Sequence, residues 1–174
     1  WIRVIDPETG ELKASANDTM SPESLTAVTT SETVITGDHT GISIRELQFD
    51  DMGEPNISEP VKRISLSGTV ELTPAVTSSR VIIAMTSGQV YAVDPATGEE
   101  EWCVNLQDTI KARPVTDGET VLIGSTASTV YALNVEDGSV RWSIETDYMI
   151  DVPPAVADGT IYVGDGCGNV TAYQ

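Results

Sequence analysis

The sequence has few of the residues that most often build metal, redox or acid–base sites. It contains one histidine, His39, and two cysteines, Cys103 and Cys167, which lie far apart in the chain. Two thiols alone make no metal site, and a single histidine lacks partners for metal binding or proton transfer. We therefore expect both cysteines to be free, and we predict no catalytic residue, no metal site and no bound cofactor.

Long apolar runs and basic stripes are also missing. No run approaches the about 20 apolar residues of a membrane-spanning helix, so we expect no membrane-spanning segment. Only 9 residues are Lys or Arg, and they form no stripe that would neutralise nucleic-acid phosphates. Nucleic acid is therefore not an expected partner.

Acidic residues, by contrast, are abundant. The chain has 27 Asp and Glu residues and a net charge of −18. Such self-repulsion destabilises a compact domain in dilute buffer, whereas at about 1 M salt the Debye length falls to roughly 3 Å. With few lysines and many Thr and Val residues, this composition is typical of a protein from an extremely halophilic archaeon. The alternative is an ordinary acidic secreted domain.

A repeat of 40 residues organises the chain. The stretch from Tyr91 to Trp102 returns as the stretch from Tyr131 to Trp142. The same interval separates the members of three further sets, which are Pro74, Pro114 and Pro154, then Val81, Val121 and Ile161, then Ala92, Ala132 and Ala172. A period near 40 is typical of propeller blades or helical repeats, and short β-branched runs with Gly-bearing turns favour blades.

Each repeat contains four short strands in a meander, which is one propeller blade. A tight turn at residues 94–98 joins the third strand to the fourth, because Pro95 presets φ and Gly98 tolerates a positive φ. We predict the equivalent turn at Gly138. Trp102 and Trp142 end the outer strands, and we expect both rings to be buried between blades as packing residues.

The motif formed by Ala92, Asp94, Thr97, Gly98 and Trp102 resembles the tryptophan-docking motif of pyrroloquinoline-quinone-type (PQQ-like) propeller repeats. Residues 154–164 resemble the companion pattern of the same family. The likeness covers residues 68–174 well and residues 1–66 loosely. It implies a β-propeller, but the family includes quinone-dependent dehydrogenases, an outer-membrane assembly scaffold and uncharacterised surface proteins, so it implies little about function. The dehydrogenases carry an adjacent cysteine pair, which this sequence lacks.

The repeat divides the chain into segments of a single partial propeller. An insertion near residues 49–60 lengthens the second segment, and Ala14 stands where the first segment would carry its tryptophan. Because propellers close to remove sheet edges, we expect the remaining blades to lie on sequence outside these 174 residues. The predicted segments are the end of a blade at 1–15, blades at 26–66, 68–106 and 108–146, and an incomplete blade at 148–174.

Charged residues recur just before the innermost strand of each blade. Glu71, Lys111 and Asp151 are 40 residues apart, and Arg113 lies two residues beyond Lys111. We predict that these four side chains face the channel mouth, where Lys111 and Arg113 bind an acidic ligand or partner segment and the two acids orient it. In PQQ-like propellers, this end of the channel is where cofactors or partner segments tend to bind.

Three Asn-x-Ser/Thr patterns begin at Asn17, Asn56 and Asn169. Asn169 precedes a strand, so we take Asn17 and Asn56 as the glycosylation candidates. Acceptor sites of this kind favour an extracellular or cell-surface location.

Three functions are compatible with the sequence. The first is a non-catalytic propeller that binds a protein partner or acts as an assembly scaffold, which the scarcity of acid–base residues favours. The second is part of a dehydrogenase that uses pyrroloquinoline quinone and calcium, and the third is a ligand-sensing propeller of a signalling protein. We expect the first and no enzymatic activity.

Overall fold

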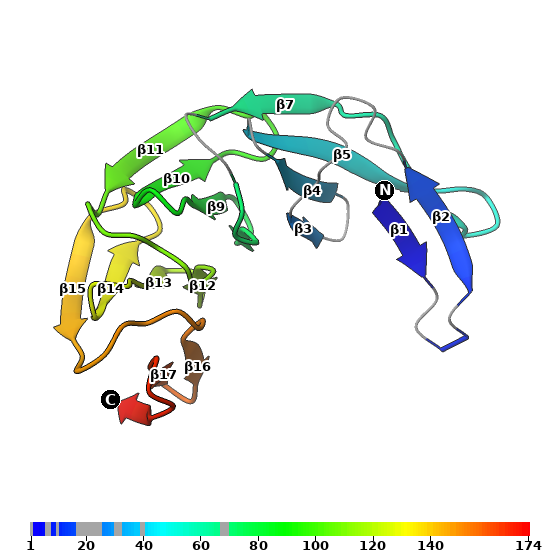
Figure 1. Cartoon of the computed structure of the whole chain (residues 1–174). Coiled ribbons are helices and arrows are strands. Elements are labelled where there is room, and N and C mark those ends of the chain that lie inside the picture. Colours follow the sequence, from blue (N-terminus) through cyan, green and yellow to red (C-terminus); the bar gives the residue numbers. More distant parts are fainter. Residues whose placement is uncertain are drawn as a thin grey trace.

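The computed structural model describes residues 2–5, 8–9, 11–16, 26–29, 33–38, 41–66 and 70–174. Within these ranges every regular element is a β-strand. The strands form five antiparallel sheets that follow one another along an arc (Figure 1). The predicted all-β propeller with four-stranded antiparallel blades is confirmed. No helix in this part of the chain has the length and hydropathy of a membrane span.

Two of the sheets are complete four-stranded meanders. The first of them contains β8 (Ala75–Val76), β9 (Val81–Ala84), β10 (Gln89–Val93) and β11 (Glu100–Asn105). The second contains β12 (Val115–Thr116), β13 (Thr120–Gly124), β14 (Thr129–Asn134) and β15 (Val140–Glu145). The outer strands β11 and β15 lie on the convex side of the arc (Figure 1).

The remaining sheets depart from this plan. A two-stranded sheet pairs β1 (Ile2–Ile5) with β2 (Leu12–Ala16), and a three-stranded sheet contains β16 (Ala155–Ala157), β17 (Thr160–Gly164) and β18 (Val170–Tyr173). The sheet after β2 contains β3 (Thr26–Thr29), β4 (Thr33–Asp38), β5 (Gly41–Phe49), β6 (Pro55–Ile57) and β7 (Lys62–Ser65). Both β6 and β7 pair with β5, so the extra residues of this blade form a short hairpin. The segment boundaries predicted from the repeat stay a prediction.

The middle strands of the two complete four-stranded blades are largely buried on both faces. In β9, Val81 and Ile83 pack in a cluster with Ile35 and Ile42 of the preceding blade. Side chains alternate along a strand, so Ile82 and Ala84 pack instead in a cluster with residues of the following blade. Full burial of such a side chain contributes about 1.5–3 kcal/mol, which explains why these strands are uninterrupted apolar runs.

Three pairs of third and fourth strands share the same register. In β1–β2, β10–β11 and β14–β15, the register shifts by one residue directly after the residue pair that contains Trp102 or its equivalent in the repeat. The aligned pairs are Val4–Ala14, Ala92–Trp102 and Ala132–Trp142. The prediction that Ala14 stands at the tryptophan position is therefore confirmed.

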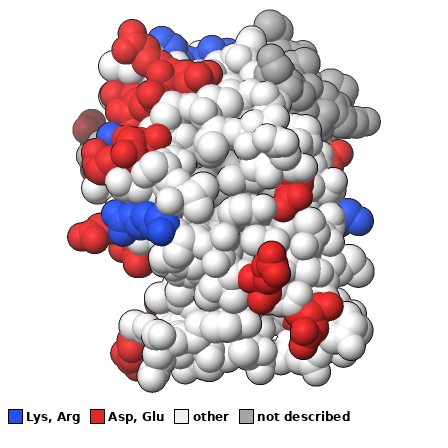
Figure 2. Space-filling model, turned by 90° about the vertical axis from the view of Figure 1, so that its left-hand side faces the viewer, with Lys and Arg blue, Asp and Glu red and all other residues white. Residues whose placement is uncertain are grey.

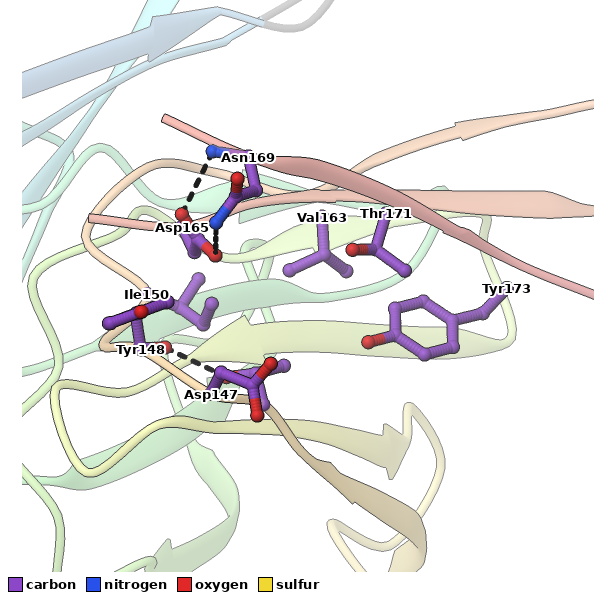
Figure 3. Close-up of a pocket in the computed structure, with 9 residues that line it drawn as sticks. Asp147, Tyr148, Ile150, Val163, Asp165, Asn169, Thr171 and Tyr173 are labelled. Atoms are coloured by element: carbon purple, nitrogen blue, oxygen red, sulfur yellow. Dashed lines mark hydrogen bonds between the residues drawn. The ribbon is translucent and has the colours of Figure 1, made fainter. Parts of the chain in front are cut away.

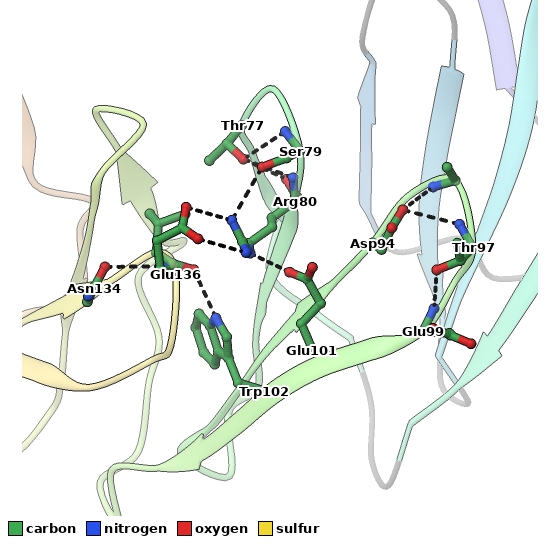
Figure 4. A network of polar contacts seen from close by, with 12 residues as sticks. Thr77, Ser79, Arg80, Asp94, Thr97, Glu99, Glu101, Trp102, Asn134 and Glu136 are labelled. Atoms are coloured by element: carbon green, nitrogen blue, oxygen red, sulfur yellow. Dashed lines mark hydrogen bonds and ion pairs between the residues drawn. The ribbon is translucent and has the colours of Figure 1, made fainter.

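Trp102 joins two blades. Its ring lies against Gly138 of the next blade, and its Nε1–H donates to the carbonyl oxygen of Val135 at 2.9 Å (Figure 4). Trp102 is 9% exposed, whereas Trp142 is 36% exposed. The predicted burial is right for Trp102 and wrong for Trp142.

The residue 40 positions before Trp102 is Lys62. The carbon atoms of its side chain occupy the space beside Gly98, just as the Trp102 ring occupies the space beside Gly138. A lysine stem can cover apolar surface while its ammonium group stays in water. Lys62 therefore takes the place of the docking tryptophan in its blade, a substitution that the sequence pattern did not reveal.

The predicted turns at Gly98 and Gly138 are confirmed, with φ of 69° and 70°. Asp94 begins the first turn, and its Oδ1 accepts the backbone N–H groups of Ala96 at 2.7 Å and Thr97 at 3.1 Å. These two hydrogen bonds stabilise the carboxylate and hold the pKa of Asp94 below its ordinary value.

Candidate functional site

A connecting segment leads from the outer strand of one blade to the innermost strand of the next. Each of three such segments is anchored by a fully buried aliphatic residue, Val70, Ile110 or Ile150. The backbone N–H groups of these residues donate to carbonyl oxygens of the preceding blade, with N–O distances of 2.9, 3.4 and 2.9 Å. The backbone at each anchor is thereby fixed to the preceding blade.

The charged residues of the predicted site follow these anchors directly. Glu71, Lys111 and Asp151 are exposed, and in each segment the proline three residues later is buried. Arg113 is also exposed, while Ala112 between the two basic residues is 1% exposed. The structure thus places the charges at equivalent points of three successive segments. That they face the channel mouth stays a prediction.

The side chains of these four residues make no hydrogen bond or ion pair with any residue that the structure describes. Several other basic side chains differ in this respect. Arg63 pairs with buried Asp38 at 2.7 Å, and Lys13 lies 3.4 Å from Glu54. The charges of Lys111 and Arg113 are therefore available to a molecule outside the described chain.

Arg80, by contrast, pairs with acidic residues of two blades. Its Nη1 and Nη2 donate to the Glu136 carboxylate at 2.9 and 3.0 Å, and its Nε lies beside Glu101 (Figure 4). Glu101 belongs to the same blade and Glu136 to the next. Burial acts to lower the pKa of Arg80, but the hydrogen bond to Glu136 and the charges of both acids outweigh it and raise that pKa. This inter-blade ion pair was not predicted from the sequence.

A cavity of about 500 Å³ lies between the β12–β15 blade and the β16–β18 sheet (Figure 3). Its lining comes from the connecting segment at Thr146–Ile150 and from β17, β18 and the turn between them. Sequence reasoning missed this cavity. The available signal was Thr171, which stands where the two preceding repeats carry Tyr91 and Tyr131.

The other predicted features have different outcomes. Cys103 and Cys167 are both free, as predicted. Asn56 is exposed on β6, whereas Asn17 and His39 lie outside the described residues. Glycosylation of either asparagine stays a prediction. Among the residues that the structure describes, no three His, Cys, Asp or Glu side chains form a group able to hold a metal ion.

Comparison with known proteins identifies the family. A family model described as "Outer membrane protein assembly factor BamB" matches residues 1–174. The fold is similar to that of BamB from Moraxella catarrhalis, with a TM-score of 0.75 and 19% identity over 94% of this chain and 50% of that chain. The chain therefore spans about half the length of that BamB structure. No curated protein sequence matches this chain at a significant level.

Two computationally designed proteins share the fold. Ika8 gives a TM-score of 0.77 and 16% identity over 98% of this chain and 51% of that chain. Ika4 gives a TM-score of 0.75 and 16% identity over 94% of this chain and 98% of that chain. At such identities the likeness shows the fold alone, whereas the family model matches the whole sequence. The chain belongs to the PQQ-like propeller family of the outer membrane protein assembly factor BamB.

Proposed function

We propose that this chain is a non-catalytic propeller segment that binds a protein partner and serves as an assembly scaffold. Membership in a family described as an assembly factor supports this function. The observation that carries the proposal is the pair Lys111 and Arg113, two exposed cations without an intramolecular partner in the described chain, held on a segment anchored by Ile110. The proposal requires no cofactor, and the single histidine and two separate cysteines give little material for acid–base or redox chemistry.

The partner segment is acidic where it contacts this pair. In a chain of net charge −18, Lys111 and Arg113 form a local positively charged site. Each contact of one of these cations with a carboxylate at 4 Å is worth about 1 kcal/mol in water. Glu71 and Asp151 occupy the equivalent positions in the adjacent segments and repel acidic groups. The partner's acidic residues therefore bind at the middle segment, and the flanking acids orient the rest of the partner.

The acidic surface indicates the conditions in which the protein works. Figure 2 shows several clusters of Asp and Glu and few Lys or Arg side chains on one face. Salt at molar concentration screens the repulsion among such clusters. We infer a halophilic archaeal origin and, with the acceptor patterns at Asn17 and Asn56, a location at the cell surface.

Site-specific cross-linking tests the binding surface. A photo-reactive amino acid replaces Asp151, which leaves Lys111 and Arg113 intact, and the protein is irradiated in native extract at molar salt. Trapped peptides are then identified by mass spectrometry. We expect one partner whose cross-linked peptide is rich in Asp or Glu.

Charge reversal provides the control for this experiment. Lys111→Glu with Arg113→Glu in the cross-linking protein should remove the product, whereas Lys13→Glu with Arg141→Glu, which changes net charge equally, should retain it. Equal yields from both variants, or no product from any of them, would contradict the proposed function.

A further inference from the structure

The cavity between the last two sheets has an apolar floor and a polar rim. Ile150 and Val163 form the floor and are 0% and 3% exposed. The rim includes Asp147, Asp165 and the hydroxyl groups of Thr171 and Tyr173, and Figure 3 shows these groups arranged around one space. Its volume of about 500 Å³ lies within the range of roughly 300–1,000 Å³ found for small-molecule sites.

The equivalent place one blade earlier is closed by a tyrosine. Subtracting 40 from Thr171 gives Tyr131, which belongs to the apolar cluster between the two preceding blades. The Tyr131 hydroxyl donates to Oδ2 of Asp108 at 2.6 Å, and Ser125 donates to the same oxygen at 3.2 Å. Tyr131 is partly buried, and Tyr91, another 40 residues earlier, is buried, at 5% exposed. Two blades thus fill this place with a phenol ring from their own third strand.

In the last sheet, three substitutions open the same place. Thr171 replaces the tyrosine with a short side chain, Tyr148 stands at the position of Asp108, and Asp165 at that of Ser125. An acidic acceptor remains next to the opening because Asp147 precedes Tyr148, and its carboxylate makes no hydrogen bond or ion pair within the described chain. The last sheet therefore keeps the apolar floor and a hydrogen-bond acceptor for a phenol hydroxyl, but it has no tyrosine side chain at position 171 to fill the space.

The wall of the cavity is held in place before any ligand enters. Asp165 accepts hydrogen bonds from Nδ2 of Asn169 at 2.8 Å and from the backbone N–H of Asn169 at 3.0 Å (Figure 3). The backbone N–H of Cys167 donates to the same carboxylate at 2.9 Å. Thr146 donates to the carbonyl oxygen of Tyr148 at 2.8 Å. A preformed cavity loses less conformational entropy on binding than one that must be assembled.

We propose that this cavity binds a phenol group in the place that Tyr131 occupies one blade earlier. The ring packs on Ile150 and Val163, and the hydroxyl donates to the carboxylate of Asp147. The phenol is either a small phenolic molecule or the side chain of a tyrosine in a partner segment. This site is separate from the Lys111 and Arg113 pair, and neither proposal depends on the other.

Titration of the intact chain with p-cresol, followed by NMR chemical shifts at molar salt, tests the site. Wild-type protein should show saturable shifts at residues around the cavity, and toluene should bind several-fold more weakly because it lacks the hydroxyl group. N-acetyltyrosine amide, compared with p-cresol, distinguishes the two sources. Tighter binding of the amide favours a partner's tyrosine, and equal or weaker binding favours a small phenol.

Two variants of one residue give the decisive comparison. Thr171→Tyr restores the tyrosine of the preceding repeats and should lower p-cresol affinity at least tenfold, whereas Thr171→Val keeps the cavity and should retain binding. If Thr171→Tyr does not fold, Asp147→Asn should instead reduce the preference for p-cresol over toluene several-fold. No saturable binding to wild-type protein, unchanged affinity in folded Thr171→Tyr, or an unchanged preference in Asp147→Asn would overturn the proposal.

Discussion

The indole ring of Trp102 lies against the α-carbon of Gly138, a residue of the following blade. A methyl group at Gly138 would lie 2.6 Å from Cε3 of the ring, closer than any van der Waals contact allows. The positive φ of Gly138 also favours glycine over other residues. Glycine is therefore required here for two reasons, the turn and the close approach of the ring.

The first prediction concerns this contact. Trp102→Ala should lower the free energy of unfolding by about 3–5 kcal/mol, because it removes a buried ring and its hydrogen bond to Val135. Trp142→Ala is the matched control, and it should cost clearly less because that ring is 36% exposed. Denaturant unfolding in molar salt measures both values. Equal losses for the two variants would contradict the inter-blade role of Trp102.

The second prediction concerns the ion pair between blades. Arg80→Met keeps the apolar stem but removes the contacts to Glu101 and Glu136, and it should cost about 1 kcal/mol, since Glu136 is largely exposed. The loss should shrink as salt rises, because screening weakens the pair in the wild-type protein. A salt-independent loss in Arg80→Met would exclude an electrostatic role.

The 40-residue period was sufficient to predict the strands, the turns at Gly98 and Gly138, and the burial of Trp102. These features depend on residues close in sequence and on apolar patterns that repeat. Contacts between blades depend instead on residues such as Arg80 and Glu136, which are far apart in the chain and have no repeating partner. Lys62 at a tryptophan position and Thr171 at a tyrosine position break the repeat. The period shows which residue each one replaces, but the contact of Lys62 with Gly98 and the cavity beside Thr171 are visible only in the structure.

The third prediction is a pH dependence at the first tight turn. The N–H groups of Ala96 and Thr97 lower the pKa of Asp94 in the folded state below its ordinary value of 3.8. Its contribution to stability is therefore fully present above that value and is lost as the pH falls through the lower folded pKa.

Asp94→Asn keeps an oxygen acceptor but does not titrate. The difference in the free energy of unfolding between wild-type protein and this variant should be constant above about pH 5 and should shrink in more acidic solution. Urea unfolding over a pH series measures this difference. If the difference stays constant down to the pH at which the protein unfolds in acid, the hydrogen bonds of the turn do not lower the pKa of Asp94.

The fourth prediction follows from the charge of −18. Thermal stability should rise steeply from dilute buffer to molar KCl, because screening relieves repulsion among the acidic clusters. Circular dichroism melting curves over a KCl series provide the measurement. Equal melting temperatures at low and high KCl would contradict adaptation to salt.

The most direct test of the proposed function is an anisotropy titration of a short, fluorescently labelled, aspartate-rich peptide with the intact chain. It is performed at the lowest salt concentration at which the chain is folded, where charge contacts are strongest. Wild-type protein and the Lys13→Glu/Arg141→Glu control should bind the peptide. Lys111→Glu/Arg113→Glu should bind at least tenfold more weakly while remaining folded, as judged by circular dichroism. Equal affinities for the two charge-reversed proteins, or no binding to wild-type protein, would contradict a role for Lys111 and Arg113 in partner recognition.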